Sequence, residues 1–470
     1  MGYLEELQKA TNRAYTENGG ATNKSSLNPC LDFFANGAAK RNDVESAVYL
    51  FERAYATDKT SALRILFYIR DIRGGQGERD IFRACLDRLK TIDEPVYEKM
   101  LPLVPEYGRW DDILGDINDT VVKLVKNQLE ADMKSDKPSL LAKWLPSENA
   151  SSKASKEVAT KLASKMGIKP RIYRKILSKL RAKIHLLEQD MSSNKWATIE
   201  YDKLPSQAFR KHTEAFRRHD LERYQKFLDD VNKGTKKVNA STVTTAEVIQ
   251  NVSKGDNDSA NAIWKSLDNF VPEDLNAIVV ADVSGSMWGR PMAISTSLAL
   301  YFAERNKGVF ANKFMTFSEN PRLVEVIGDT LTQKLKYIET AEWGMNTNIE
   351  RTFDALLQAA VMAREDKENI PKVIYIISDM EFDYCADGAD ETAFENARRK
   401  WSAVGLELPT VVFWNVESRS NNTPATKFDT NVALISGSNQ SAFRFAFEGK
   451  TPLDLMHEVI DSERYQAIKA

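Results

Sequence analysis

AIVVADVSGSM, residues 277–287, is the stretch that decides the fold class of the C-terminal half. Its apolar residues run without a break up to Asp282, and an unbroken run of this length is typical of a strand buried on both faces. Asp282, Ser284 and Ser286 then stand at alternate positions, and Gly285 lets the backbone turn between the serines. The stretch therefore predicts a buried strand whose carboxyl end aims three oxygen atoms at one point.

More strands of this kind follow, separated by helical stretches such as NIERTFDALLQAAVMA (348–363). The further runs rich in β-branched or aromatic residues are KFMTF (313–317), KVIYIIS (372–378), PTVVFWN (409–415) and NVALIS (431–436). Strands that alternate with helices indicate an α/β, doubly wound, Rossmann-like domain with a mostly parallel sheet. In such domains ligands bind at the carboxyl ends of the strands, which is where Asp282 stands.

The oxygens of DVSGSM favour a hard divalent cation. One carboxylate and two hydroxyls suit Mg²⁺, or another divalent cation such as Mn²⁺ or Ca²⁺, and do not suit zinc. A single carboxylate carries too little charge to hold a divalent cation alone, so further ligands must come from the ends of other strands. Thr347 stands before a predicted helix, and Asp379 directly follows KVIYIIS. The candidate metal ligands are therefore Asp282, Ser284, Ser286, Thr347 and Asp379; in the alternative interpretation the serines only cap the helix that follows.

DVSGSM, a threonine after a glycine-containing loop and an aspartate at the end of a later strand together resemble the metal-ion-dependent adhesion site of von Willebrand factor A domains. The resemblance implies that Asp282, Ser284, Ser286 and Thr347 are ligands and that Asp379 acts mostly through water. SDM replaces the TDG that is common in that family, which keeps the acid. In the family, one metal position receives a partner's carboxylate, so the site binds rather than catalyses.

The first 230 residues carry helical periodicity. SALRILFYIRDI (61–72) and ERDIFRACLDRL (78–89) place apolar residues three and four apart, and GGQG (74–77) is typical of a turn between two helices. Another predicted helix carries its apolar stripe on Ile172, Ile176, Leu180, Ile184 and Leu187. No strict period is present, which excludes a regular tetratricopeptide or ankyrin array and leaves degenerate helix pairs of the HEAT type.

Two domains follow from this pattern. We expect an all-α domain of HEAT-like helical repeats over residues 1–260 and the α/β domain over residues 261–470. A polar stretch near residues 252–260 is the expected linker.

The net charge of −2 conceals a basic segment. Residues 151–240 hold 22 Lys and Arg against 10 Asp and Glu, and such segregation indicates a polyanionic partner. A solvated basic face is the alternative. Aromatic residues are interleaved with these charges, although they more often pack in cores than stack on bases. The candidate contacts to the phosphates of such a partner are Arg171, Arg174, Lys175, Lys179, Lys183, Arg210, Lys211, Arg217 and Arg218.

The order of the two halves resembles the Ro autoantigen family, in which a TROVE helical-repeat module precedes a von Willebrand factor A domain. The plan is still more similar to that of uncharacterised phage and bacterial proteins. The stretches that carry the resemblance are FYIRDIRGGQGERDIFR (67–83), YGRWDDIL (107–114), KLPSQAFRKH (203–212), DVSGSM and ISDMEFD (377–383). The resemblance implies a ribonucleoprotein, in which a ring of helical repeats binds small noncoding RNA on a basic outer surface. The single-stranded ends of the RNA enter the ring. The basic residues of 151–240 named above are then the candidate RNA contacts.

Catalytic, secretory and membrane signals are missing from the sequence. The four histidines make no metal or triad pattern, GGQGERD lacks the GK[ST] of a phosphate loop, and GSNQ (437–440) is a weak phosphate signal. The three cysteines form no zinc or disulfide pattern, and no apolar window reaches the length of a membrane span. We therefore expect a cytoplasmic protein that is not an enzyme; its oligomeric state stays open.

Two functions remain. The first is a Ro-like scaffold that binds small noncoding or structured RNA and whose divalent-metal site receives a partner's carboxylate. The second is a protein-interaction or assembly module, in a phage particle or host complex, which uses the metal site and has no role with RNA.

Overall fold

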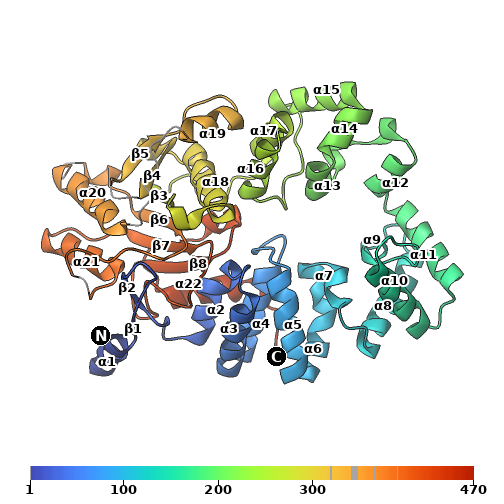
Figure 1. Cartoon of the computed structure of the whole chain (residues 1–470), viewed down its shortest axis with the longest axis horizontal. Helices are drawn as coiled ribbons and strands as arrows, with labels where there is room; N and C mark the ends of the chain where they lie inside the picture. Colours follow the sequence, from blue (N-terminus) through green and yellow to red (C-terminus); the bar gives the residue numbers. More distant parts are fainter. Residues whose placement is uncertain (1, 318–319, 340–347, 364–365, 389) are drawn as a thin grey trace.

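A computed structural model describes residues 2–317, 320–339, 348–363, 366–388 and 390–470. Figure 1 shows an arc of helices that leaves the α/β part on one side and returns to it on the other. Within the described residues, no helix is long and apolar enough to cross a membrane.

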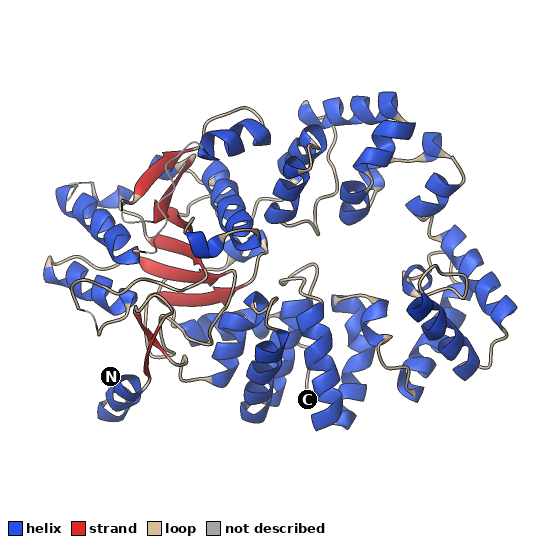
Figure 2. Ribbon diagram, in the orientation of Figure 1, coloured by secondary structure: helices blue, strands red, loops and turns tan. Residues whose placement is uncertain are grey.

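The C-terminal half contains a six-stranded sheet in the order β5-β4-β3-β6-β7-β8 (Figure 2). All neighbouring strands pair in parallel except β4 and β5. Every residue of β3, β6, β7 and β8 is buried, as their unbroken apolar runs predict. The strands are β3 (Ala277–Asp282), β4 (Lys313–Phe317), β5 (Arg322–Glu325), β6 (Val373–Ser378), β7 (Thr410–Asn415) and β8 (Val432–Ser436).

Helices cover this sheet, which confirms the expected α/β architecture. They are α18 (Arg290–Arg305), α19 (Leu331–Glu339), α20 (Ile349–Met362), α21 (Ala393–Ala403) and α22 (Pro452–Ile460). Helix α18 follows DVSGSM and packs on β3, while α20 packs beside α21.

The N-terminal half is helical, as expected, apart from one hairpin. Its helices are α1 (Tyr3–Thr11), α2 (Pro29–Asn36), α3 (Val44–Thr57), α4 (Lys59–Arg70), α5 (Asp80–Ile92), α6 (Glu94–Met100), α7 (Val104–Tyr107), α8 (Asp119–Lys134), α9 (Leu141–Trp144), α10 (Lys153–Lys165), α11 (Pro170–Lys183), α12 (Leu187–Ser192), α13 (Ser206–Lys211), α14 (Thr213–His219), α15 (Leu221–Asn232), α16 (Thr245–Ser253) and α17 (Asn257–Ser266).

The hairpin, β1 (Arg13–Tyr15) and β2 (Ala21–Asn23), corrects the expectation that this half is all-α. Its residues make isolated bridges to Asp383 and Thr423 in the loops of the α/β part. Tertiary pairing, rather than local sequence preference, therefore holds these few residues extended.

Both ends of the helical arc are attached to the α/β part (Figure 1). Helix α2 packs on β8, where the Ser436 hydroxyl donates to the Phe34 carbonyl at 2.7 Å. Helix α16 packs on α18, where the hydroxyls of Thr245 and Ser297 lie 2.9 Å apart. Residues 252–260, where we expected a linker, lie mostly in α16 and α17, so the two halves join through packed helices.

Helix α11 buries Leu180, as expected, but its other buried residues differ from the expected ones. Tyr173, Leu177 and Leu180 are its buried residues, whereas Ile172 is 50% exposed. Both stripes satisfy helical spacing, and the large aromatic ring of Tyr173 takes the inward position. The other aromatics interleaved with the basic residues are buried as well, namely Phe209, Phe216 and Tyr224.

Candidate functional site

The oxygens of DVSGSM converge at the carboxyl end of β3, as their spacing predicts. Asp282 is fully buried; its Oδ1 accepts a hydrogen bond from the Ser284 amide at 2.9 Å, and its Oδ2 accepts one from the Ser378 hydroxyl at 2.6 Å. The hydroxyls of Ser284 and Ser286 lie 3.0 Å apart. Neither serine caps the helix that follows through a side-chain hydrogen bond, because α18 begins only after Gly289.

Asp379 joins this group because β6 is the parallel neighbour of β3, and Asp379 directly follows β6. It is 2% exposed, and its Oδ1 accepts the Glu381 amide at 3.2 Å. Its Oδ2 is buried and accepts no hydrogen bond from the described residues. Burial, together with the nearby Asp379 charge, raises the pKa of Asp282 to about 7. Two buried carboxylates therefore lie close together, and one of their four oxygens, Asp379 Oδ2, accepts no hydrogen bond from the described residues.

Arg419, on the loop after β7, supplies a positive charge to this group. Its Nε lies 3.4 Å from Asp379 Oδ2, and its Nη2 donates to the Ser286 carbonyl. The same guanidinium lies 3.7 Å from a carboxylate oxygen of Glu17 in the N-terminal hairpin. The sequence gives no signal for Arg419 or Glu17, because both reach the site only through tertiary packing.

Glu381 anchors the hairpin beside the site rather than entering the oxygen cluster. It is 2% exposed and accepts the Glu17 amide at 2.8 Å and the Ser420 hydroxyl at 2.9 Å. Burial raises the pKa of this carboxyl.

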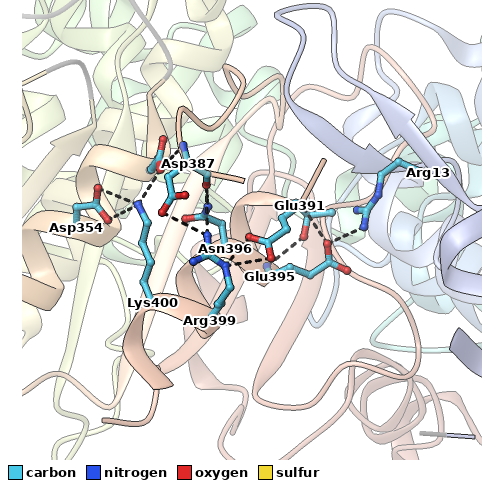
Figure 3. Close-up of polar contacts among 10 residues, drawn as sticks. Arg13, Asp354, Asp387, Glu391, Glu395, Asn396, Arg399 and Lys400 are labelled. Atoms are coloured by element: carbon cyan, nitrogen blue, oxygen red, sulfur yellow. Dashed lines mark hydrogen bonds and ion pairs between the residues drawn. The ribbon is translucent and has the colours of Figure 1, made fainter. Parts of the chain in front are cut away.

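Thr347, the remaining candidate ligand, lies outside the described residues. Helix α20 begins just after it, and a polar network ties α20 to the loop that follows Asp379 (Figure 3). Lys400 Nζ lies 2.7 Å from Glu350 and 2.9 Å from Asp354, both on α20. Glu350 also accepts the Ala386 amide at 2.6 Å. This brace fixes the helix after Thr347 relative to the loop after Asp379.

The same network continues to the N-terminal hairpin. Arg399 contacts Glu391 at 2.9 Å, and Arg13 of β1 contacts Glu395 at 2.8 Å (Figure 3). Three separate parts of the chain thus hold the loops at this edge of the sheet.

The donor set fits a hard divalent cation. Asp282, Ser284, Ser286 and Asp379 offer only oxygen atoms, and Asp379 Oδ2 accepts no hydrogen bond from the described residues, with the Arg419 guanidinium 3.4 Å away. In the part of the chain that the structure describes, no three His, Cys, Asp or Glu residues are grouped to hold a metal. A cation here therefore depends on the serine hydroxyls as well as the carboxylates.

The candidate RNA contacts divide into exposed and engaged residues. Lys183 donates to the Ser135 carbonyl at 2.8 Å, Arg210 pairs with Glu247 at 3.2 Å, and Arg217 pairs with Asp256 at 2.6 Å. The remaining residues are exposed and form no ion pair within the described chain: Arg171, Arg174, Lys175, Lys179, Lys211 and Arg218. Four of them lie on α11.

Two family models match the chain. The one described as Domain of unknown function (DUF2828) matches residues 16–92 and 117–277, and the one described as Domain of unknown function (DUF7788) matches residues 276–468. The chain is 31% identical over 501 residues to Uncharacterized protein L728 of Acanthamoeba polyphaga mimivirus, covering 96% of this chain and 87% of that protein. The chain therefore belongs to the family that carries these two domains.

A solved structure was also matched. The crystal structure of the Deinococcus radiodurans RO (RSR) protein aligns with 91% of this chain and 93% of that chain, at 12% identity and a TM-score of 0.36. A likeness of this size carries no weight for function. The adhesion-site and Ro resemblances therefore stay predictions.

Proposed function

We propose that this chain is an RNA-binding scaffold that holds small noncoding or structured RNA on the exposed basic face of α11. At the sheet edge, a divalent metal ion would receive a carboxylate from a protein partner. Both activities are binding, so the chain is not an enzyme. The observation that supports this function best is the set of unpaired cations on one helix: Arg171, Arg174, Lys175 and Lys179.

These four side chains point away from the buried face of α11. Arg174, Lys175 and Lys179 stand three, four and eight positions after Arg171. All four residues therefore lie opposite the buried stripe of Tyr173, Leu177 and Leu180. Like charges at this spacing repel one another, and phosphates relieve the repulsion. Lys156 and Lys161 on the neighbouring α10 are exposed too.

The metal part of the proposal depends on the oxygen cluster. Asp282, Ser284, Ser286 and Thr347 would be ligands of Mg²⁺, some directly and some through water, and Asp379 would act mostly through water. When bound, the ion would offer an open coordination position to an outside carboxylate. Arg419 would have to leave Asp379 Oδ2 before that oxygen could face the ion.

The test is RNA affinity measured over a range of salt concentrations. The variant R174E/K175E/K179E should bind total cellular RNA at least about tenfold more weakly, with a log affinity against log salt slope reduced by about 2–3. The matched control K336E/K367E/K372E makes the same charge change on exposed residues of the α/β half and should keep the wild-type slope. Equal losses in both variants, or no RNA binding by the wild type, would refute the proposal.

A second candidate function is a protein-interaction or assembly module without RNA. The observation that favours it is the exposure of aromatic side chains on the loops beside the oxygen cluster. Trp288, directly after DVSGSM, is 86% exposed, and Tyr384, after Asp379, is 58% exposed. Exposed aromatics are frequent anchors of protein interfaces. Crosslinking in the native cell separates the two functions. The interaction module predicts that a protein partner is recovered with the wild type and lost with Trp288→Ala. It also predicts that only background RNA is recovered.

A further inference from the structure

A polar cavity of about 400 Å³ lies where both ends of the helical arc meet the α/β part. Its walls come from the α4–α5 loop, from α13, from residues 240–247 and from residues 438–441 after β8. GGQGERD and GSNQ, neither of which makes a phosphate site alone, therefore line one cavity. Arg290, the first residue of α18, contributes from the sheet side.

Eight basic and four acidic side chains line the cavity. Half of the basic residues are matched by a carboxylate. The matched pairs are Arg41 with Glu78, Arg70 with Asp112, Arg79 with Asp80 and Arg210 with Glu247. Arg73, Arg109, Lys211 and Arg290 form no ion pair with the described residues, and neither does the remaining lining carboxylate, Asp268. The cavity therefore keeps an excess of positive charge after its internal pairs are formed.

Several of these cations are held close to one another by the fold. Burial lowers the pKa of Arg41, and the charge of Arg290 lowers it further, while Glu417, Glu247 and Asp80 partly oppose this shift; the two guanidinium groups therefore lie close enough to repel. The guanidinium of Arg109 lies 4.5 Å from the centre of the Trp144 ring, which fixes its position. An anion in the cavity would relieve this repulsion.

One wall of the cavity is rigid. The Asn439 side chain donates to the Gly75 carbonyl at 2.6 Å, and the Asn439 amide donates to Gln76 at 3.2 Å. Gly437 has a φ of 110°, and a Cβ there would lie 2.1 Å from Gln76 Oε1. The two glycine-containing loops are thus locked together, and a ligand would meet a preformed surface.

We propose that this cavity binds a compact small molecule that carries several adjacent phosphates, of the nucleoside triphosphate or inositol polyphosphate class. The volume suits a ligand of nucleotide size. Hydroxyl and amide groups accompany the cations in the lining, including Ser241, Thr242 and Asn439, and can bind phosphate or sugar oxygens. Such a ligand would contact both ends of the helical arc at once. The site is separate from the α11 surface and does not depend on the function proposed for it.

The test is calorimetric titration of the full chain in EDTA, which keeps divalent ions from the DVSGSM oxygens. The probes are tripolyphosphate, ATP, myo-inositol hexakisphosphate and orthophosphate. We expect saturable one-to-one binding of at least one polyphosphate, a rise in melting temperature, and affinity at least about tenfold above that of orthophosphate. Preference for ATP or for the inositol compound identifies the source of the phosphates.

Variants assign the binding to the cavity. K211Q/R290Q breaks no ion pair and should weaken binding at least about tenfold, whereas K211R/R290K should restore it. R174E/K175E/K179E on α11 should bind like the wild type. The proposal is overturned if no polyphosphate binds, if only RNA binds, if K211Q/R290Q binds normally, or if the α11 variant loses binding equally. Unchanged melting of K211R/R290K without ligand establishes that the fold tolerates these positions.

Discussion

Two clusters of buried carboxylates, one in the helical half and one at the sheet edge, differ in how their charges are balanced. Asp112 is 5% exposed, and both of its oxygens accept hydrogen bonds from guanidinium groups, Oδ2 from Arg70 and Oδ1 from Arg83, each at 2.8 Å. Asp282 instead lies near a second carboxylate, Asp379, whose Oδ2 accepts no hydrogen bond from the described residues.

The difference separates a structural charge from a candidate binding charge. Asp112 connects α4, α5 and the segment before α8, and each of its oxygens has a guanidinium partner. The Asp282 and Asp379 pair raises the free energy of the folded state when both are ionised, so the fold holds these groups at a cost. A buried pair of carboxylates in which one oxygen, Asp379 Oδ2, accepts no hydrogen bond is expected where a cation binds.

The largest expected effect on stability is at Asp112, whose two carboxylate oxygens are both paired with guanidinium groups. Asp112→Ala leaves the buried Arg70 without its partner and should lower the free energy of unfolding by about 3–5 kcal/mol. Urea denaturation followed by circular dichroism measures this loss. A change below about 1 kcal/mol would show that Arg70 finds another partner or water.

At the sheet edge, removing a charge should stabilise the fold rather than destabilise it. In EDTA, Asp282→Asn should raise the free energy of unfolding at pH 8 by about 1–3 kcal/mol, because burial and Asp379 raise the pKa of Asp282 to about 7. An acid whose pKa rises on folding binds more protons in the folded state, so its ionisation weakens the fold as pH rises.

The pH dependence checks that sign. The difference between the Asn variant and the wild type should be near zero at about pH 4, grow up to about pH 7 and then stay constant. Denaturation curves at several pH values measure it. A difference that does not change with pH would mean that folding does not raise the pKa of Asp282.

A smaller effect is expected at Arg419, which competes with a cation for Asp379. Arg419→Gln should strengthen Mg²⁺ binding by up to about tenfold, because the guanidinium no longer neutralises Oδ2. Titration calorimetry measures the affinity. Asp282→Ala is the control and should abolish binding; equal Mg²⁺ affinity in the wild type and Arg419→Gln would remove Arg419 as a competitor.

The smallest effect on stability is expected on α11. R174E/K175E/K179E changes exposed residues without ion pairs, so its free energy of unfolding should stay within about 0.5 kcal/mol of the wild type. Thermal melting provides the measurement. A loss of several kcal/mol would show that these side chains stabilise the helix, and any loss of RNA binding would then need another variant to interpret it.

Sequence reasoning located the oxygen cluster because that cluster depends on local pattern and strand order. An unbroken apolar run identifies a central parallel strand, and parallel neighbours end at one edge, which brings Asp282 and Asp379 together. Arg419 and Glu17 could not be found in this way, since loops far apart in the chain bring them to the site.

Other predictions show what composition and spacing alone do not determine. The basic segment includes Arg210 and Arg217, which are engaged with carboxylates, because composition records charges and not their partners. On α11, Tyr173 and Leu177 are buried in place of Ile172 and Ile176, because both stripes satisfy helical spacing and share Leu180. Arg73, Arg109 and Arg290 of the cavity lie outside the basic segment 151–240, so the charge count gives no signal for them.

The packing of α2 on β8 has a consequence for synthesis on the ribosome. Phe33 and Phe34 of α2 are fully buried, and their strand neighbour at residues 432–436 leaves the ribosome about 400 residues later. At ordinary rates of translation, this apolar helix waits about 20–80 s for its partner. The nascent chain is therefore expected to engage chaperones, and release of residues 1–260 alone should yield aggregated protein.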